Sequence, residues 1–173
     1  MRMDLTVATY ETWDDLLVYM DGSAAVIGEM MLPILEPLSP EATAHARDLG
    51  NAFQLTNFLR DVGEDLDRGR VYVPQEDVRR FGAESAFEQQ QATPAFVELM
   101  RFEVERCRAL YASADLGIGM LPPASARCIR AARVLYSRIL ERIEAQSYDV
   151  FSSRATVPTW QKAATAAGAL LRG

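Results

Sequence analysis

Helix signals dominate this sequence, and strand signals are nearly absent. Alternation with a period of two residues, which is typical of strands, appears only briefly near residues 71–73. The stretches expected to be helical begin after Thr or Ser caps or at proline and end at glycine or proline, and they are 12–35, 40–66, 94–116, 124–146 and a weaker 157–171. Helices of this length joined by short loops are typical of a bundle with antiparallel neighbours. The sequence therefore predicts an all-α helical bundle, with residues 1–173 in one domain.

Glycine and proline mark the expected interruptions. Gly22 and Gly28 interrupt the first helix, and Pro33 is expected to kink or end it. Two segments, 67–82 and 82–91, are expected to be irregular connectors because turn residues are frequent in them.

Composition excludes several classes of protein. The formal net charge of −6, without a face dense in Lys and Arg, argues against a nucleic-acid-binding protein. Two cysteines, Cys107 and Cys128, form neither a disulfide framework nor a zinc signature, and they are expected to be half-buried helix thiols. We find no secretory leader and expect no segment that spans a bilayer, so a cytoplasmic protein is expected.

One helix face has an unusual set of oxygen-bearing side chains. Spacing at 100° per residue puts these four residues within an arc of roughly 80°: Gln54, Asn57, Asp61 and Asp65. Like charges at positions i and i+4 repel each other mildly. A hard divalent cation such as Mg²⁺ prefers oxygen ligands and would relieve that repulsion. The strip is therefore either a cation–diphosphate site or an ordinary solvated polar face.

Arginines follow the acidic strip closely. Arg60, Arg68 and Arg70 lie near the aspartates in sequence, and guanidinium groups bind phosphate as forked donors. Surface ion pairs between these arginines and the aspartates are the alternative interpretation.

The amino-acid sequence of this region resembles a known motif. Gln54-Leu-Thr-Asn-Phe-Leu-Arg-Asp-Val-Gly-Glu-Asp65, followed by Arg68-Gly-Arg-Val-Tyr-Val-Pro74, resembles the second aspartate-rich motif of the phytoene/squalene synthases, the trans-head-to-head prenyl synthases. The match is closer to phytoene synthases than to squalene synthases. Similarity extends over nearly the whole chain, from Met3-Asp4-Leu5 to Arg154-Ala155. The resemblance implies an all-α bundle of the isoprenoid synthase type.

The resemblance also implies an activity and a set of site residues. Members of this family join two allylic diphosphates head to head through a cyclopropyl intermediate, geranylgeranyl diphosphate giving phytoene, with Mg²⁺ or Mn²⁺ as cofactor. Metal ligands are expected at Asn57, Asp61 and Asp65. The other expected catalytic and substrate-binding residues are Arg60, Tyr72, Tyr136, Gln54 and Arg154, with Ala24, Val26, Ile27, Gly28, Ala46 and Gly50 along a prenyl tunnel.

The sequence also departs from the family pattern. The first aspartate-rich motif and the helices that bear it are not found, so we expect an incomplete bundle and no catalysis by this polypeptide alone. A partner that supplies the N-terminal half, or self-association, is expected instead. Contact with a membrane surface is also expected, because the implied substrate is hydrophobic. Two alternatives are a squalene- or dehydrosqualene-forming relative and a non-catalytic, assembly-factor-like interaction protein. Proteins of the second kind tend to lose the aspartates, whereas Asp61 and Asp65 are both present.

Overall fold

The computed structural model describes residues 3–158 and Gly168. Its elements, in chain order, are η1 (Met3–Leu5), α1 (Trp13–Met20), the π-helix η2 (Asp21–Ala25), α2 (Val26–Leu35), α3 (Ala42–Arg60), α4 (Val62–Asp67), α5 (Gln75–Phe81), α6 (Glu84–Gln89), α7 (Pro94–Ile118) and α8 (Pro123–Ala145). No strand occurs within residues 3–158, where one isolated parallel bridge pairs Thr9 with Val71. The all-α prediction is therefore confirmed. The expected helix 157–171 falls almost wholly outside the described residues.

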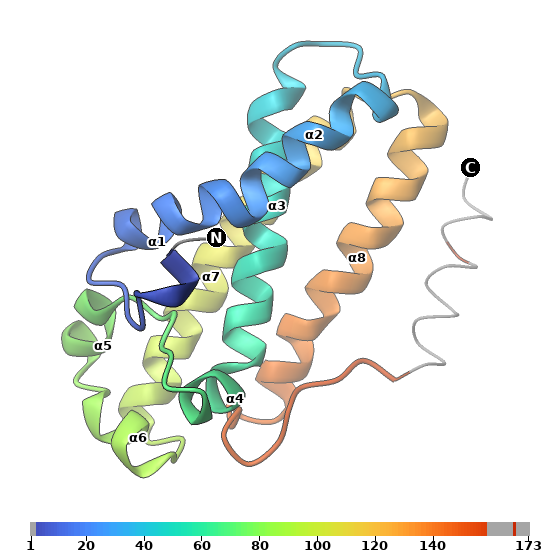
Figure 1. Cartoon of the computed structure of the whole chain (residues 1–173). Coiled ribbons are helices and arrows are strands. Elements are labelled where there is room, and N and C mark those ends of the chain that lie inside the picture. Colours follow the sequence, from blue (N-terminus) through green and yellow to red (C-terminus); the bar gives the residue numbers. More distant parts are fainter. Residues whose placement is uncertain (1–2, 159–167, 169–173) are drawn as a thin grey trace.

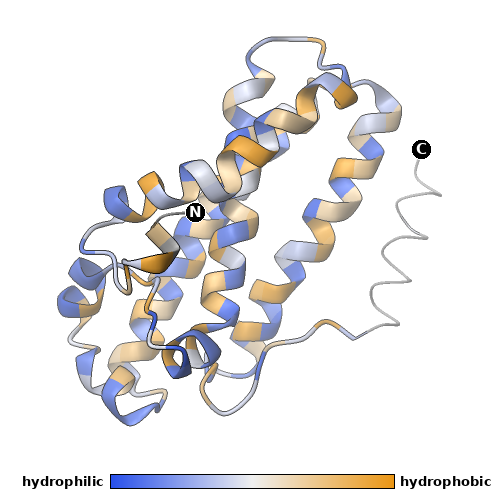
Figure 2. Cartoon of the chain, in the orientation of Figure 1, coloured by the Kyte–Doolittle hydropathy of each residue, from blue (hydrophilic) through white to orange (hydrophobic). Residues whose placement is uncertain are grey.

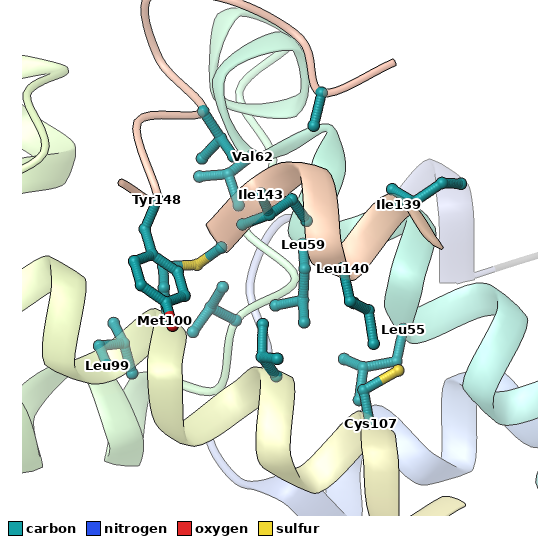
Figure 3. Packing of buried hydrophobic residues seen from close by; sticks show 14 of the residues in the cluster. Leu55, Leu59, Val62, Leu99, Met100, Cys107, Ile139, Leu140, Ile143 and Tyr148 are labelled. Atoms are coloured by element: carbon teal, nitrogen blue, oxygen red, sulfur yellow. The ribbon is translucent and has the colours of Figure 1, made fainter. Parts of the chain in front are cut away.

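Helix α3 is the central element. It packs against α7, α2 and α8, while α5 packs against the N-terminal part of α7 (Figure 1). Buried side chains of α3, α7 and α8 converge in the core, as Leu55, Met100 and Ile143 show in Figure 3. This packing holds the polar strip of α3 in a fixed position between α2 and α8.

Caps predicted from the sequence begin two of the helices. Thr12 forms a capping box with Asp15 at the start of α1, and Thr93 accepts a hydrogen bond from the amide of Phe96 at the start of α7. These side chains satisfy amides that have no partner inside the helix.

Two expected helices are interrupted, the first at Gly22 as expected and the second at a position that was not expected. The stretch 12–35 contains a π-helical turn, Asp21–Ala25, where Arg47 of α3 pairs with both Asp21 and Glu29. The stretch 40–66 begins later, at Ala42, and is interrupted at Asp61, whose φ of −102° and ψ of 14° separate α3 from α4. The second break falls at the first aspartate of the predicted motif.

The prediction of irregular connectors is wrong for part of 67–91. Helices α5 and α6 form there because their apolar residues have a place in the core. Val78, Ala83 and Ala86 are buried in the same cluster as the side chains of α7. Tertiary packing stabilises helices that are too short to persist alone.

Exposed apolar side chains lie on α1, on α2 and on the loop that follows α2. They are Val18, Ile27, Met30, Met31, Ile34 and Leu38, with Ile34 exposed to 72%. Figure 2 shows hydrophobic residues along α2. Residues Trp13–Leu35, with the π-helical turn included, are long and apolar enough to cross a membrane, by length and composition only. The expectation that no segment of the chain passes this criterion is therefore wrong.

The two cysteines differ in their surroundings. Cys107 is buried in the core on α7, and Cys128 is exposed on α8. The expectation of two half-buried thiols is wrong for both.

A buried acidic group joins α5 to α7. Arg106 Nη1 donates to Asp77 Oδ2 at 2.8 Å and to both carboxylate oxygens of Glu103 at 2.8 and 2.9 Å. The guanidinium of Arg106 also lies over the ring of Trp13, 4.5 Å from its centroid. Burial raises the pKa of Glu103 from 4.5 to about 8, while Arg106 opposes the shift and Asp77 adds to it.

The raised pKa of Glu103 predicts that stability falls with rising pH. Between pH 4.5 and about 8 the folded state binds more protons at Glu103 than the unfolded state does, so the free energy of unfolding decreases as pH rises. Glu103→Gln should flatten this dependence between pH 5 and about 8, measured as melting temperature by circular dichroism. Glu105→Gln, on the exposed side of α7, is the matched control and should leave the profile as it is in the unaltered chain. An unchanged profile in Glu103→Gln would contradict the prediction.

Candidate active site

The polar strip of α3 and α4 meets an apolar cavity at its N-terminal end. Gln54 and Asn57 both line the cavity. Asn57 Oδ1 is buried and has no hydrogen-bond partner among the described residues. A buried acceptor without a donor is costly, so this oxygen is available for a group that the protein itself does not supply.

Asp61 is held by two forked arginines. Arg60 donates from Nε to Oδ1 at 2.7 Å and from Nη2 to Oδ2 at 2.6 Å. Arg154, which is 93 positions away in sequence, donates from Nε to Oδ1 at 2.8 Å and from Nη2 to Oδ2 at 3.0 Å. Folding therefore brings together three of the predicted residues at one carboxylate.

The two aspartates of the motif differ electrostatically. Burial acts to raise the pKa of Asp61, but hydrogen bonds from Arg60 and Arg154 outweigh it and leave the pKa below its ordinary value. For Asp65, burial and the charge of Asp61 raise the pKa, and the ion pair with Arg68, at 3.6 Å, does not offset them. The negative charge of Asp65 is therefore only partly compensated by its neighbouring arginines.

The donor set fits an oxygen-preferring cation. No group of three or more His, Cys, Asp and Glu side chains with metal-binding geometry occurs among residues 3–158. Magnesium, however, needs only one or two carboxylates and completes its shell with water and substrate phosphate. The unpartnered oxygen of Asn57 and the partly compensated charge of Asp65 are the features that such a cation would satisfy. Asp61 is available only when an arginine gives way.

The apolar cavity has a volume of about 330 Å³ and lies between α2, α3, α7 and α8. Its lining comprises Ser23, Ala24, Ile27, Gly28, Met31, Leu32, Leu35, Ala42, His45, Ala46, Leu49, Gly50, Phe53, Gln54, Asn57, Ala114, Gly117, Ile118, Leu121, Ile129 and Tyr136. Five of the six expected tunnel residues are in this set. The sixth, Val26, lies outside the cavity lining, so its expected place along the tunnel is wrong.

Gly28 and Gly50 line the cavity and also lie where the backbones of neighbouring helices meet. A Cβ on Gly28 would lie 2.1 Å from the carbonyl oxygen of Ala46, and one on Gly50 would lie 2.3 Å from that of Ala24. The two glycines allow the backbones of neighbouring helices to touch, so they set helix spacing rather than simply leaving room for a ligand.

Tyr136 separates two cavities. It lines the apolar cavity and also a second cavity of about 440 Å³, whose lining includes Arg60 and Arg154. Its ring packs on Phe53, with centroids 4.5 Å apart. The residue thus stands between the cationic and the apolar parts of the site.

Tyr72 lies behind the polar strip. Its ring stacks on Phe58 with centroids 3.9 Å apart, and its hydroxyl accepts a hydrogen bond from Arg70 Nη1 at 3.0 Å. It lines neither cavity, so its catalytic role stays a prediction.

His45 is a lining residue to which the sequence gave no role. Its Nδ1 lies 2.9 Å from the hydroxyl of Ser113, and that hydroxyl donates to Asp48 Oδ2 at 2.5 Å. The small residues Ala114 and Gly117 on α7 let this side chain fit against the helix. No local motif indicates these contacts, since they join residues far apart in sequence.

Comparison with known proteins identifies the family of the chain. The profile of the family described as squalene/phytoene synthase matches residues 1–161. The phytoene synthase of Arthrospira platensis is 39% identical over 93% of this chain and 57% of its own length. The 15-cis-phytoene synthase of Synechococcus elongatus is 37% identical over 99% of this chain and 60% of its own length.

Solved structures show the same fold. A dehydrosqualene synthase solved in complex with a ligand superposes with a TM-score of 0.89 and 29% identity, covering 99% of this chain and 61% of the other. The squalene synthase HpnC of Alicyclobacillus acidocaldarius gives a TM-score of 0.80 and 32% identity, over 85% of this chain and 56% of the other. The chain thus spans between half and two thirds of the length of these relatives. On sequence and fold together, it belongs to the squalene/phytoene synthase family.

Proposed function

We propose that this chain supplies one aspartate-rich motif and one prenyl cavity of a head-to-head prenyltransferase that condenses two geranylgeranyl diphosphates to phytoene through a cyclopropyl intermediate. The observation that carries the proposal is the continuity of an apolar cavity with a strip of oxygen ligands that ends at Asp61 and Asp65. A prenyl diphosphate matches both parts: its hydrocarbon tail suits the apolar cavity, and its diphosphate suits a cation held by the oxygen ligands.

Each part of the site has a separate task in this proposal. Mg²⁺, when bound, neutralises the leaving diphosphate and makes it a better leaving group. Asn57, Asp61 and Asp65 would hold that cation, and Arg60 and Arg154 would donate forked hydrogen bonds to phosphate oxygens. The apolar lining keeps water from the allylic cation that remains when the diphosphate leaves.

Cavity length supports a substrate with four isoprene units. The lining extends along α3 from Asn57 to Ala42, fifteen residues, which is about 22 Å at the rise of an α-helix. An extended chain advances about 1.2 Å per bond, so four isoprene units extend about 19 Å and three about 14 Å. A chain of four units therefore uses the full cavity, and a chain of three leaves its far end empty.

The length argument predicts a change of preference when the cavity is shortened. Ala46 lies eleven residues from Asn57, about 16 Å along the helix. Ala46→Phe should weaken binding of a geranylgeranyl thiolodiphosphate at least about tenfold, because the last isoprene unit loses its burial. Binding of the farnesyl analogue should change little. Ala44→Phe, at an exposed position of the same helix, is the control. Equal losses for both analogues would contradict the assignment of the far end.

A squalene- or dehydrosqualene-type reaction is the second candidate. Its support is the superposition on the dehydrosqualene synthase structure, with a TM-score of 0.89. Preference for the three-unit diphosphate over the four-unit diphosphate in the unaltered chain would favour this candidate.

The proposed function is tested by Mg²⁺-dependent binding and turnover of geranylgeranyl diphosphate. We expect binding that disappears when EDTA removes the cation. Turnover is to be measured with the chain alone and with an added N-terminal half of a related synthase, because the resemblance implies a further motif there. Absence of any cation-dependent binding would overturn the proposal and favour a non-catalytic interaction protein.

A further inference from the structure

Asp61 has no free lone pair to offer a cation in the observed arrangement. A carboxylate has about four acceptor sites, and Arg60 and Arg154 together donate four hydrogen bonds to it, at 2.6–3.0 Å. Any cation that binds Asp61 must therefore displace at least one guanidinium.

Arg154 is the partner that can leave more easily. Its side chain is 44% exposed, against 18% for Arg60. Its two hydrogen bonds are also the longer pair. A second carboxylate is already near, since Nε of Arg154 lies 3.5 Å from Glu64 Oε1. Arg60, by contrast, is adjacent to Asp61 in the chain and more buried.

The backbone around Arg154 has its own anchors. Residues 149–158, here called the C-terminal strap, are held by the buried side chains of Ala155 and Val157. Gln146 Nε2 also donates to the carbonyl oxygens of Asp149 and Ser153, at 2.7 and 2.9 Å. The Arg154 side chain can therefore turn while the strap stays in place, and the second cavity beside it gives it room.

We propose that Arg154 is a displaceable partner of Asp61: it occupies the carboxylate until a divalent cation binds, and its guanidinium then turns to the diphosphate that arrives with the cation. The inference rests on the proposed function, because it takes Asp61 as a cation ligand. It makes Arg154 a positioning residue with two successive partners. The arginine competes with the cation before the substrate binds and helps to hold the substrate afterwards.

The test is whether Arg154→Ala changes the affinity for Mn²⁺ and the affinity for pyrophosphate in opposite directions. We measure Mn²⁺ binding to the chain by electron paramagnetic resonance, and then the binding of inorganic pyrophosphate in the presence of Mn²⁺. Arg154→Ala should bind Mn²⁺ alone about fivefold more tightly, because a forked competitor is gone, yet bind pyrophosphate about tenfold more weakly. Arg154→Lys should fall between Arg154→Ala and the unaltered chain in both measurements, since lysine keeps the charge without the fork.

Arg68→Ala is the matched control for simple removal of positive charge. Arg68 lies 3.6 Å from Asp65, and its ion pairs among the described residues are with Glu64 and Asp65 rather than with Asp61. If both variants tighten Mn²⁺ binding equally, or if Arg154→Ala weakens it, the displacement is wrong while the cation site stands. If Mn²⁺ binding does not depend on Asp61, tested with Asp61→Asn, both the displacement and the assigned metal role are wrong.

Discussion

Asp61→Asn is expected to weaken Mg²⁺-dependent binding of geranylgeranyl diphosphate by about 100-fold. The substitution removes a charged ligand from a set that has only two carboxylates, Asp61 and Asp65. In the unaltered chain the guanidinium groups of Arg60 and Arg154 share the Asp61 carboxylate. In the variant both groups face a neutral amide instead. Isothermal titration with a non-hydrolysable analogue, with and without Mg²⁺, measures the effect.

Asp67→Asn is the matched control for this loss. Asp67 ends α4, is exposed, and makes one long hydrogen bond with Gln90 at 3.3 Å. We expect this variant to bind as the unaltered chain does. If Asp61→Asn binds the analogue within a factor of about three of the unaltered chain, Asp61 is not a cation ligand.

Gly28→Ala is expected to lower stability by about 3 kcal/mol, which is the upper part of the usual range for overpacked sites. The added Cβ would lie 2.1 Å from a backbone oxygen, that of Ala46, so no side-chain rotation can relieve the overlap. Helices α2 and α3 would have to move apart. For a chain of this size the melting temperature should fall by roughly 6–12 °C, measured by circular dichroism.

Gly119→Ala provides the comparison. Gly119 has an ordinary helical φ of −66°, and a Cβ there would lie 3.2 Å from the Leu116 carbonyl oxygen, with no other close contact. A melting temperature for Gly28→Ala that equals that of Gly119→Ala would show that α2 and α3 can separate without cost.

Local sequence signals predicted the long helices and the interruption at Gly22, but not the break at Asp61 or the short helices α5 and α6. The caps Thr12 and Thr93 act within three residues, so their effect could be inferred from sequence alone. Helices α5 and α6, by contrast, depend on burial against α7. Such tertiary contacts leave no local pattern.

The candidate site divides in the same way. Gln54, Asn57 and Asp61 share one helix, so helical spacing and the family motif were enough to group them. The pairing of Arg154 with Asp61 joins residues 93 positions apart, and the family resemblance, not the spacing, suggested that Arg154 was relevant. The cavity wall formed by α7 and α8 could not be predicted, because no motif marks it.

The contacts at Gly28 and Gly50 have a consequence for how such a cavity diversifies. One of its walls is main chain held against main chain, so its width there is fixed by the crossing of α2 and α3 and cannot be altered by exchanging side chains. Substitutions of these two glycines therefore cannot alter ligand preference without loss of folding, whereas other lining side chains, such as Ala46, Ala114 and Ile118, can change while the crossing stays as it is. Divergence in substrate range should accumulate at such positions while the two glycines stay invariant.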